Sequence, residues 1–215
     1  MRASAREAVN GVVLAGLLGS VAGASAAFHL EDGTTLTFTA GLASKEERHP
    51  MEPDDRMLAG SVGKTFFAAA ALHLAHAKKL GLDDPAAQYL GDEQWYAALP
   101  HSREITVRHL LQHTSGLKRY VMASELWKRL LEERDKVWTV PELLAYLPAG
   151  GLFAPGAGWA YCDTGYLVLG EVLERVSGKD VYDYVRDNLL EPHGFEHTSP
   201  SDRRDLPALA QGYTA

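Results

Sequence analysis

The sequence contains a single cysteine, Cys162, so no disulfide can form within the chain and the redox compartment stays undecided. Acidic residues outnumber basic ones by 28 to 21, and the net charge of -7 comes without a basic cluster, which argues against a nucleic-acid partner. No apolar run is rich enough in large side chains to predict a membrane span. What remains is an ordinary globular chain of 215 residues, long enough for one good-sized domain or two small ones.

The N-terminal segment, residues 1–23, supports two interpretations. An uncharged run follows two arginines, and Ala24-Ser25-Ala26 is typical of a signal-peptidase site. Four glycines in the run and Glu7 in its positive flank favour a helix within the domain instead. The apolar face of that helix would consist of Val13, Leu14, Leu17, Leu18 and Val21. Cleavage would also remove the start of a predicted strand, so we favour the helix, and a cytoplasmic protein slightly over a secreted one.

Two short runs, residues 24–30 and 34–40, predict a β-hairpin. They are joined through Glu31-Asp32-Gly33, and Asp-Gly between alternating apolar runs is a strong hairpin signal. The alternating apolar positions are Phe28, Leu30, Leu36 and Phe38. The next segment, residues 41–56, is polar with two prolines, and we expect a loop that leads to a helix.

A serine and a lysine stand three residues apart at the start of that predicted helix, in Ser61-Val62-Gly63-Lys64. Because positions i and i+3 share a helix face, the Lys64 amine can lie beside the Ser61 hydroxyl. The positive helix N-terminus would favour a Ser61 alkoxide and help Lys64 to give up a proton, which activates serine without histidine. A second match, Ser115 to Lys118, falls on a turn, so the motif alone is weak, and an ordinary N-cap role for Ser61 stays open.

Helical patterns dominate the middle of the chain. Thr106 is predicted to cap a short helix that stops at the Ser115-Gly116 turn. His109 and His113 have the i, i+4 spacing of zinc ligands, but no third ligand is apparent, so we interpret them as hydrogen-bonded residues that hold a turn. Further helices are predicted over 125–134, 141–147, 167–176 and 181–190.

Six sequence blocks stand in an order that is known from one family. The blocks are Ser61-Val62-Gly63-Lys64, 79–85, 105–117, 155–166, 169–179 and 191–194. With them the chain resembles the penicillin-binding serine hydrolases, in particular the branch of class C β-lactamases, D-Ala-D-Ala carboxypeptidases and related esterases. The resemblance covers about 24–213. It implies an α/β (α+β) fold of the serine β-lactamase type, a single domain over 1–215 with a mainly helical subdomain at 85–160 and an antiparallel sheet.

The resemblance also implies roles for four residues in hydrolysis of an amide, ester or lactam, in a small molecule or peptide, with no cofactor and no metal. Ser61 would be the nucleophile that becomes acylated, and Lys64 the group that lowers its proton affinity. Tyr161 would be the base and the proton donor to the leaving group, because a cationic Lys64 favours its ionised form; without the resemblance, a packed tyrosine is the better interpretation. Asp163, in a substrate-binding position, replaces the usual asparagine. Since a carboxylate only accepts hydrogen bonds, esterase or peptidase activity is favoured over β-lactamase activity.

The family's third motif, Lys-Thr-Gly or His-x-Gly on a strand, has no match after Asp163. The resemblance then implies that the sequence encodes only the N-terminal hairpin of the sheet and lacks the second oxyanion-hole donor. We expect the chain by itself to be impaired, and to need a complementing C-terminal segment or to self-associate through its open sheet edge. The alternative is a non-catalytic remnant that serves as a ligand-binding or scaffold protein. An α/β-hydrolase is disfavoured, because no Gly-x-Ser-x-Gly elbow occurs.

Overall fold

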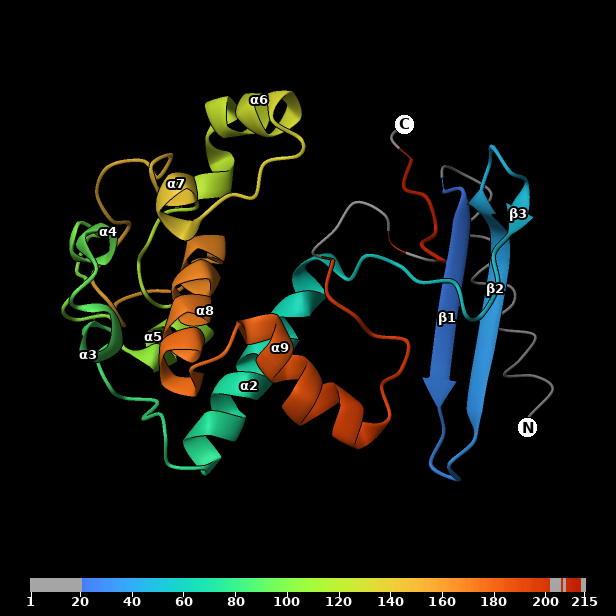
Figure 1. Ribbon diagram of the computed structural model, residues 1–215, viewed down its shortest axis with the longest axis horizontal. Coiled ribbons are helices and arrows are strands. Elements are labelled where there is room, and N and C mark those ends of the chain that lie inside the picture. Colours follow the sequence, from blue (N-terminus) through green and yellow to red (C-terminus); the bar gives the residue numbers. More distant parts are fainter. Residues whose placement is uncertain (1–20, 202–205, 207, 214–215) are drawn as a thin grey trace. The chain divides into compact units, whose positions relative to one another are not determined.

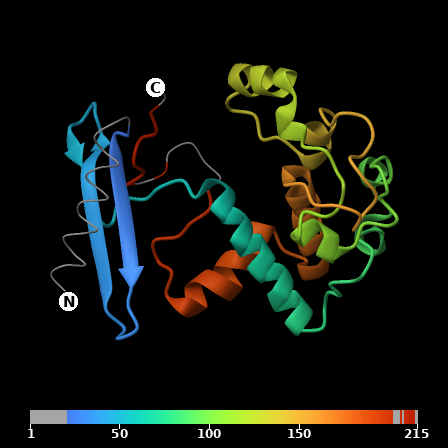
Figure 2. The ribbon, with the colours of Figure 1, turned by 180° about the vertical axis from the view of Figure 1, so that it is seen from behind.

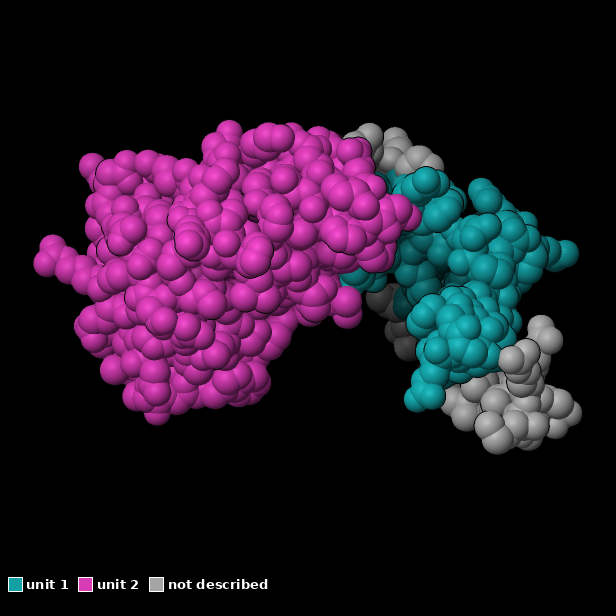
Figure 3. All heavy atoms as spheres, turned by 90° about the horizontal axis from the view of Figure 1, so that it is seen from below, with its two compact units in different colours: residues 1–60, 196–215 teal, residues 61–195 magenta. Residues whose placement is uncertain are grey.

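The computed structural model describes residues 21–201, 206 and 208–213. The chain divides into two compact units, Met1–Gly60 with Glu196–Ala215, and Ser61–Phe195 (Figure 3). Of the predicted N-terminal helix or signal peptide at 1–23, residues 1–20 lie outside the described part, so the choice between the two interpretations stays untested. Within the described part, no helix combines the length and the apolar character needed to cross a membrane.

The first unit is built on the predicted hairpin. Strands β1 (Gly23–His29) and β2 (Thr35–Ser44) pair antiparallel (Figure 1). At the turn, Gly33 adopts a φ of 81°, which glycine tolerates without strain, and Asp32 Oδ1 accepts a hydrogen bond from the Thr34 backbone N–H at 3.0 Å. Phe28 and Phe38 stack edge to face across the pair, with ring centroids 5.9 Å apart. The hairpin prediction is confirmed.

The prediction of a plain loop over 41–56 is wrong. Strand β2 continues to Ser44, and a third strand, β3 (His49–Pro50), pairs with it antiparallel, so the sheet has the order β1-β2-β3 rather than a hairpin alone. A two-residue strand carries no alternating apolar pattern, and its proline is tolerated only because it lies at the sheet edge. A parallel bridge between Arg56 and Leu209 joins the C-terminal segment to the same unit.

The second unit begins with the serine-lysine segment. A 3₁₀ turn, η1 (Gly60–Gly63), runs directly into helix α2 (Lys64–His76), and Gly63 between them keeps right-handed helical dihedrals. One face of α2 is buried through its small residues and Leu74. The helix ends at His76, and two residues later Lys78 turns into the left-handed region with a φ of 58°.

Six short helices follow α2 along the chain. They are α3 (Ala87–Leu90), α4 (Gln94–Ala97), α5 (Val107–Leu111), η2 (Tyr120–Met122), α6 (Ser124–Glu132) and α7 (Val140–Leu144). Thr106 caps α5 as predicted, because its hydroxyl accepts a hydrogen bond from the His109 backbone N–H at 3.2 Å. The helices predicted over 125–134 and 141–147 are found as α6 and α7.

Helix α8 (Asp163–Ser177) is the core of the unit, and α2 and α5 pack against it (Figures 1 and 2). Its fully buried side chains include Val168, Leu169, Val172 and Leu173. The helix begins four residues before the predicted start at Leu167. The reason is an unusual cap: the Cys162 sulfur accepts a hydrogen bond from the Gly165 backbone N–H at 3.3 Å, and Asp163 stands in the first turn.

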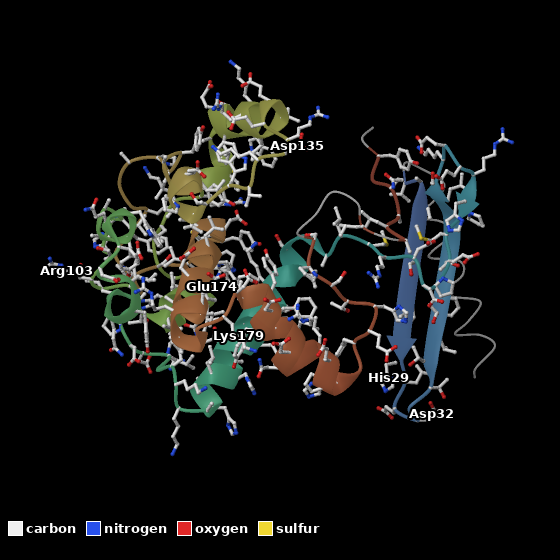
Figure 4. The ribbon with its side chains drawn as sticks, in the orientation of Figure 1. His29, Asp32, Arg103, Asp135, Glu174 and Lys179 are labelled. Atoms are coloured by element: carbon white, nitrogen blue, oxygen red, sulfur yellow. The ribbon has the colours of Figure 1, made fainter. Side chains whose placement is uncertain are left out.

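The predicted helix over 181–190 is found in two parts, α9 (Val181–Val185) and the π-helical η3 (Arg186–Leu190), followed by η4 (Glu191–His193). Its start is tied to α8, because Glu174 Oε1 accepts a hydrogen bond from the Val181 backbone N–H at 3.2 Å. Lys179 in the connecting turn pairs with Asp187 at 2.7 Å (Figure 4). These contacts fix the connection between the two helices.

Leu173→Ala is expected to lower the free energy of unfolding by about 2–5 kcal/mol, because it leaves a cavity beside fully buried neighbours on α8. Urea denaturation followed by circular dichroism measures this. The control is Leu131→Ala on α6, whose side chain is 63% exposed and whose loss should change stability by no more than about 0.5 kcal/mol. Equal losses for both variants would contradict a core built on α8.

Candidate active site

Ser61 and Lys64 lie side by side, as their spacing predicts. Ser61 belongs to η1 and Lys64 is the first residue of α2, so the two stand on consecutive elements, within one helical turn of each other. The Lys64 Nζ donates a hydrogen bond to Ser61 Oγ over 3.4 Å. The hydroxyl therefore has a cationic neighbour on its own helical face.

The first turn of α8 brings Asp163 to the same lysine. Asp163 Oδ1 lies 3.0 Å from Lys64 Nζ, and Asp163 Oδ2 accepts a hydrogen bond from Arg119 Nε at 2.8 Å. Burial raises the pKa of a carboxyl group, but the hydrogen bonds from Arg119 and Lys64 outweigh burial here and lower the pKa of Asp163. Asp163 is therefore an ionised carboxylate with a partner on each oxygen.

Tyr161 lies just before α8 and presents its ring to Lys64, whose Nζ is 5.1 Å from the ring centroid. Its hydroxyl is shielded from solvent and has no well-aligned hydrogen bond among the described residues. Burial raises the pKa of a phenol, but Lys64 and Ser61 lie close enough to outweigh it, so the pKa of Tyr161 is lowered. The Tyr161 phenol therefore loses its proton more readily than an ordinary tyrosine does.

Lys64 keeps its proton and is the cation of the site. Burial lowers the pKa of an ammonium group, but interactions with Tyr161 and Asp163 outweigh burial, and the pKa of Lys64 is raised. The helix N-terminus, which we expected to help Lys64 give up a proton, does not decide its charge state. Of the two possible bases, the electrostatics favour Tyr161, with Lys64 as a fixed cation.

His113 holds the Tyr161 segment in place. Its Nδ1 accepts a hydrogen bond from the Cys162 backbone N–H at 3.1 Å, and its ring centroid lies 4.5 Å from that of Tyr161. Burial and the charge of Lys64 lower the pKa of His113 and favour the neutral ring. His109 instead accepts from the Thr106 backbone N–H at 3.2 Å, so both histidines hold turns, as predicted. No group of three or more metal-binding side chains was found in the described part of the chain.

The second Ser-x-x-Lys sequence forms no such site. Ser115 is 1% exposed, and Lys118 donates to the Ala149 carbonyl at 2.5 Å instead of to the serine. Between them, Gly116 has a φ of 73°, and a Cβ there would lie 2.0 Å from the Phe153 carbonyl oxygen. This turn requires glycine, and it has a structural role.

Sequence reasoning missed Arg119. The residue lies 44 positions before its partner Asp163, on the segment that enters η2. The available signal was the carboxylate itself: an aspartate at a position where an amide is usual needs a compensating cation when it is shielded from water. The sequence has 21 lysines and arginines, and it does not say which of them balance Asp163. The structure shows that Arg119 joins Lys64 in this role.

Comparisons with known proteins identify the family of the chain. The model of the Beta-lactamase family matches residues 14–215. Penicillin-binding protein 4* of Bacillus subtilis (strain 168) is 28% identical over 176 residues, which cover 80% of this chain and 37% of that protein. Esterase EstB of Burkholderia gladioli is 34% identical over 162 residues, which cover 72% of this chain and 41% of the esterase.

Among solved structures, the D-stereospecific amidohydrolase from Streptomyces sp. superposes with a TM-score of 0.76 at 31% sequence identity. The match covers 86% of this chain and 54% of the amidohydrolase. The fold of the serine β-lactamase type is therefore confirmed, although the chain spans only 37% and 41% of the two curated relatives. By sequence and by fold, this chain belongs to the Beta-lactamase family.

Proposed function

We propose that this chain carries the nucleophile of a serine hydrolase, which cleaves an amide, ester or lactam through an acylated Ser61. The observation that carries the proposal is the position of Lys64 Nζ, 3.4 Å from Ser61 Oγ and 3.0 Å from Asp163 Oδ1. Relatives that are named as an esterase and a D-stereospecific amidohydrolase support ester and amide bonds as targets.

The proposed reaction uses the charge states described above. Tyr161, once it has lost its proton beside Lys64, takes the Ser61 proton while Ser61 Oγ attacks the substrate carbonyl carbon. The Ser61 backbone N–H donates to the oxyanion, and Tyr161 then returns the proton to the leaving nitrogen or oxygen as the scissile bond breaks. In the second half of the reaction Tyr161 takes a proton from water, which attacks the acyl carbon; the bond to Ser61 Oγ breaks, and Tyr161 gives that proton back to Ser61.

In this proposal Asp163 also influences which substrates bind. Both of its oxygens are already engaged by cations, and as a carboxylate it can only accept further hydrogen bonds. It therefore cannot donate a hydrogen bond to a substrate carbonyl, which the amide side chain usual at this position in the family could do. This favours esters and peptides over β-lactams as substrates.

A fluorophosphonate probe tests the proposal, because it forms a stable bond to an activated serine. Peptide mass spectrometry should find one phosphonyl group per chain, on the peptide that contains Ser61 and not on the one that contains Ser115. A label elsewhere, or no label even when C-terminal strands are supplied as described next, would refute it. Ligand binding without any label would support the non-catalytic alternative.

We further propose that additional strands complete the sheet at β1. Among the described residues, no strand lies beside β1 on the side away from β2, and Phe28 on this strand is 43% exposed. An open edge of this kind accepts another strand. The strands would come from a complementing C-terminal segment, and in its absence from a second copy of the chain.

Co-expression with the C-terminal half of the Streptomyces D-stereospecific amidohydrolase should therefore give a one-to-one complex by light scattering. It should also raise the rate of Ser61 phosphonylation by about 10²–10³-fold, the effect of one restored oxyanion donor. The Ser61→Ala chain is the control, because it should form the same complex without being labelled. Absence of both the complex and the rate gain would contradict completion at this edge.

A further inference from the structure

Arg119 stands between the carboxylate and the tyrosine of the site. Its Nε donates to Asp163 Oδ2 at 2.8 Å, and its Cζ lies 5.2 Å from the centroid of the Tyr161 ring. The Asp163 side chain is only 16% exposed, whereas that of Arg119 is 38% exposed. A partly exposed guanidinium thus covers a shielded carboxylate.

We infer that Arg119 is a positioning residue of the Ser61 site, which holds one oxygen of Asp163, neutralises its charge and leaves the other oxygen to Lys64. The inference rests on the proposed function for the reaction that it serves. The arginine would touch neither the substrate nor the serine, and it would act through Asp163.

The net charge beside Tyr161 explains why Asp163 needs Arg119. Lys64 and Asp163 alone sum to zero, so the Tyr161 phenolate would gain little from a lysine that is fully paired with a carboxylate. With Arg119 the three groups sum to +1, because the Arg119–Asp163 pair is formally neutral, as an asparagine side chain would be. The pair therefore restores at Tyr161 the electrostatic balance of a lysine beside an uncharged amide.

No other described group beside the site takes this part. Besides Arg119, the titratable groups that face Lys64 and Asp163 are Tyr120, Tyr161, Cys162, Tyr166 and His113. Burial raises the pKa of Tyr120, Cys162 and Tyr166 and lowers that of His113, so these four favour their neutral forms. Among the described residues of the site, only Lys64 and Arg119 are ion-paired with Asp163.

The test combines Arg119→Gln with Asp163→Asn. In the chain that carries Asp163, Arg119→Gln should lower the rate of Ser61 phosphonylation at pH 7 about tenfold and move the acid limb of its pH profile to higher pH. Without Arg119, the negative charge of Asp163 is no longer neutralised and disfavours the Tyr161 phenolate. The pKa of Tyr161 then rises, so the acid limb moves to higher pH. Arg119→Lys should recover part of the rate. In the Asp163→Asn chain, Arg119 has lost the carboxylate that holds it, and its 38% exposed side chain is free to turn from the Tyr161 ring into solvent. There the same Arg119→Gln change should alter the rate less than about twofold.

Arg108→Gln is the matched control. Arg108 pairs with Asp83 through bonds of 2.6 and 2.8 Å, at a more exposed position and without a contact to the site residues, so its loss should leave rate and pH profile unchanged. Equal rate losses from Arg119→Gln in both backgrounds, or a loss without a shift of the acid limb, would overturn the inference and leave Arg119 a merely structural residue.

A second readout separates this inference from the proposed function. The ¹³Cζ resonance of Tyr161, assigned with Tyr161→Phe, reports its ionisation without any reaction at Ser61. A titration that moves to higher pH in Arg119→Gln, but not in Arg108→Gln, upholds the pairing even if the fluorophosphonate never labels the protein. An unchanged titration overturns the inference even if Ser61 proves to be the nucleophile.

Discussion

Replacing Ser61 with alanine is expected to abolish phosphonylation and to lower ester hydrolysis by about 10⁶-fold, or to the limit of detection. The reason is that, among the described serines, Ser61 alone has its hydroxyl within hydrogen-bond distance of the Lys64 amine, at 3.4 Å. Loss of a nucleophile removes the covalent path altogether, whereas loss of a supporting group slows it. Intact-protein mass spectrometry and release of p-nitrophenol measure the two quantities.

Ser124→Ala is the control for this loss. Ser124 is exposed at the start of α6 and is followed by no lysine at the i+3 position. Its removal should change neither labelling nor hydrolysis. A label that persists in Ser61→Ala would move the nucleophile to another residue and contradict the account.

Replacing Lys64 with methionine is expected to lower the rate of Ser61 acylation by about 10³-fold, within the range for loss of a proton-transfer partner. Methionine keeps much of the side-chain length and removes the charge. Lys64 lowers the pKa of Tyr161, and in the proposed reaction Tyr161 must be deprotonated to act as the base. Without Lys64 that pKa rises, so the acid limb of the pH profile should move to higher pH, and the loss should shrink as the pH increases.

Lys118→Met separates this effect from a general loss of positive charge. Lys118 belongs to the second Ser-x-x-Lys sequence and binds a backbone carbonyl. Its replacement should leave the acylation rate within about twofold of the unsubstituted protein. A loss that is constant at every pH for Lys64→Met would show that the lysine does not act through Tyr161.

The parts of the fold that local signals determine could be predicted from the sequence. Asp32-Gly33 between alternating apolar residues specified the hairpin, and Thr106 specified the start of α5. The approach of Lys64 to Ser61 follows from helical spacing alone, since both residues lie within one turn of each other.

Other features depend on contacts that no local pattern encodes. The early start of α8 depends on a sulfur cap at Cys162, and β3 is too short to show a period. The pairing of Arg119 with Asp163 joins residues 44 positions apart, and it follows from the packing of α8 beside η2. Family resemblance placed Tyr161 and Asp163 in the site, but it could not say which cation would balance the carboxylate.

We expect Ser61 to carry the acyl group during turnover, with Tyr161 as the base. The decisive experiment is rapid-quench mass spectrometry with a p-nitrophenyl ester, on the chain co-expressed with the C-terminal half of the Streptomyces amidohydrolase. One acyl group per chain should appear on the Ser61 peptide as p-nitrophenol is released, and it should form more slowly in Tyr161→Phe. Release of p-nitrophenol at full rate without any acylated Ser61 peptide would refute this role of Ser61.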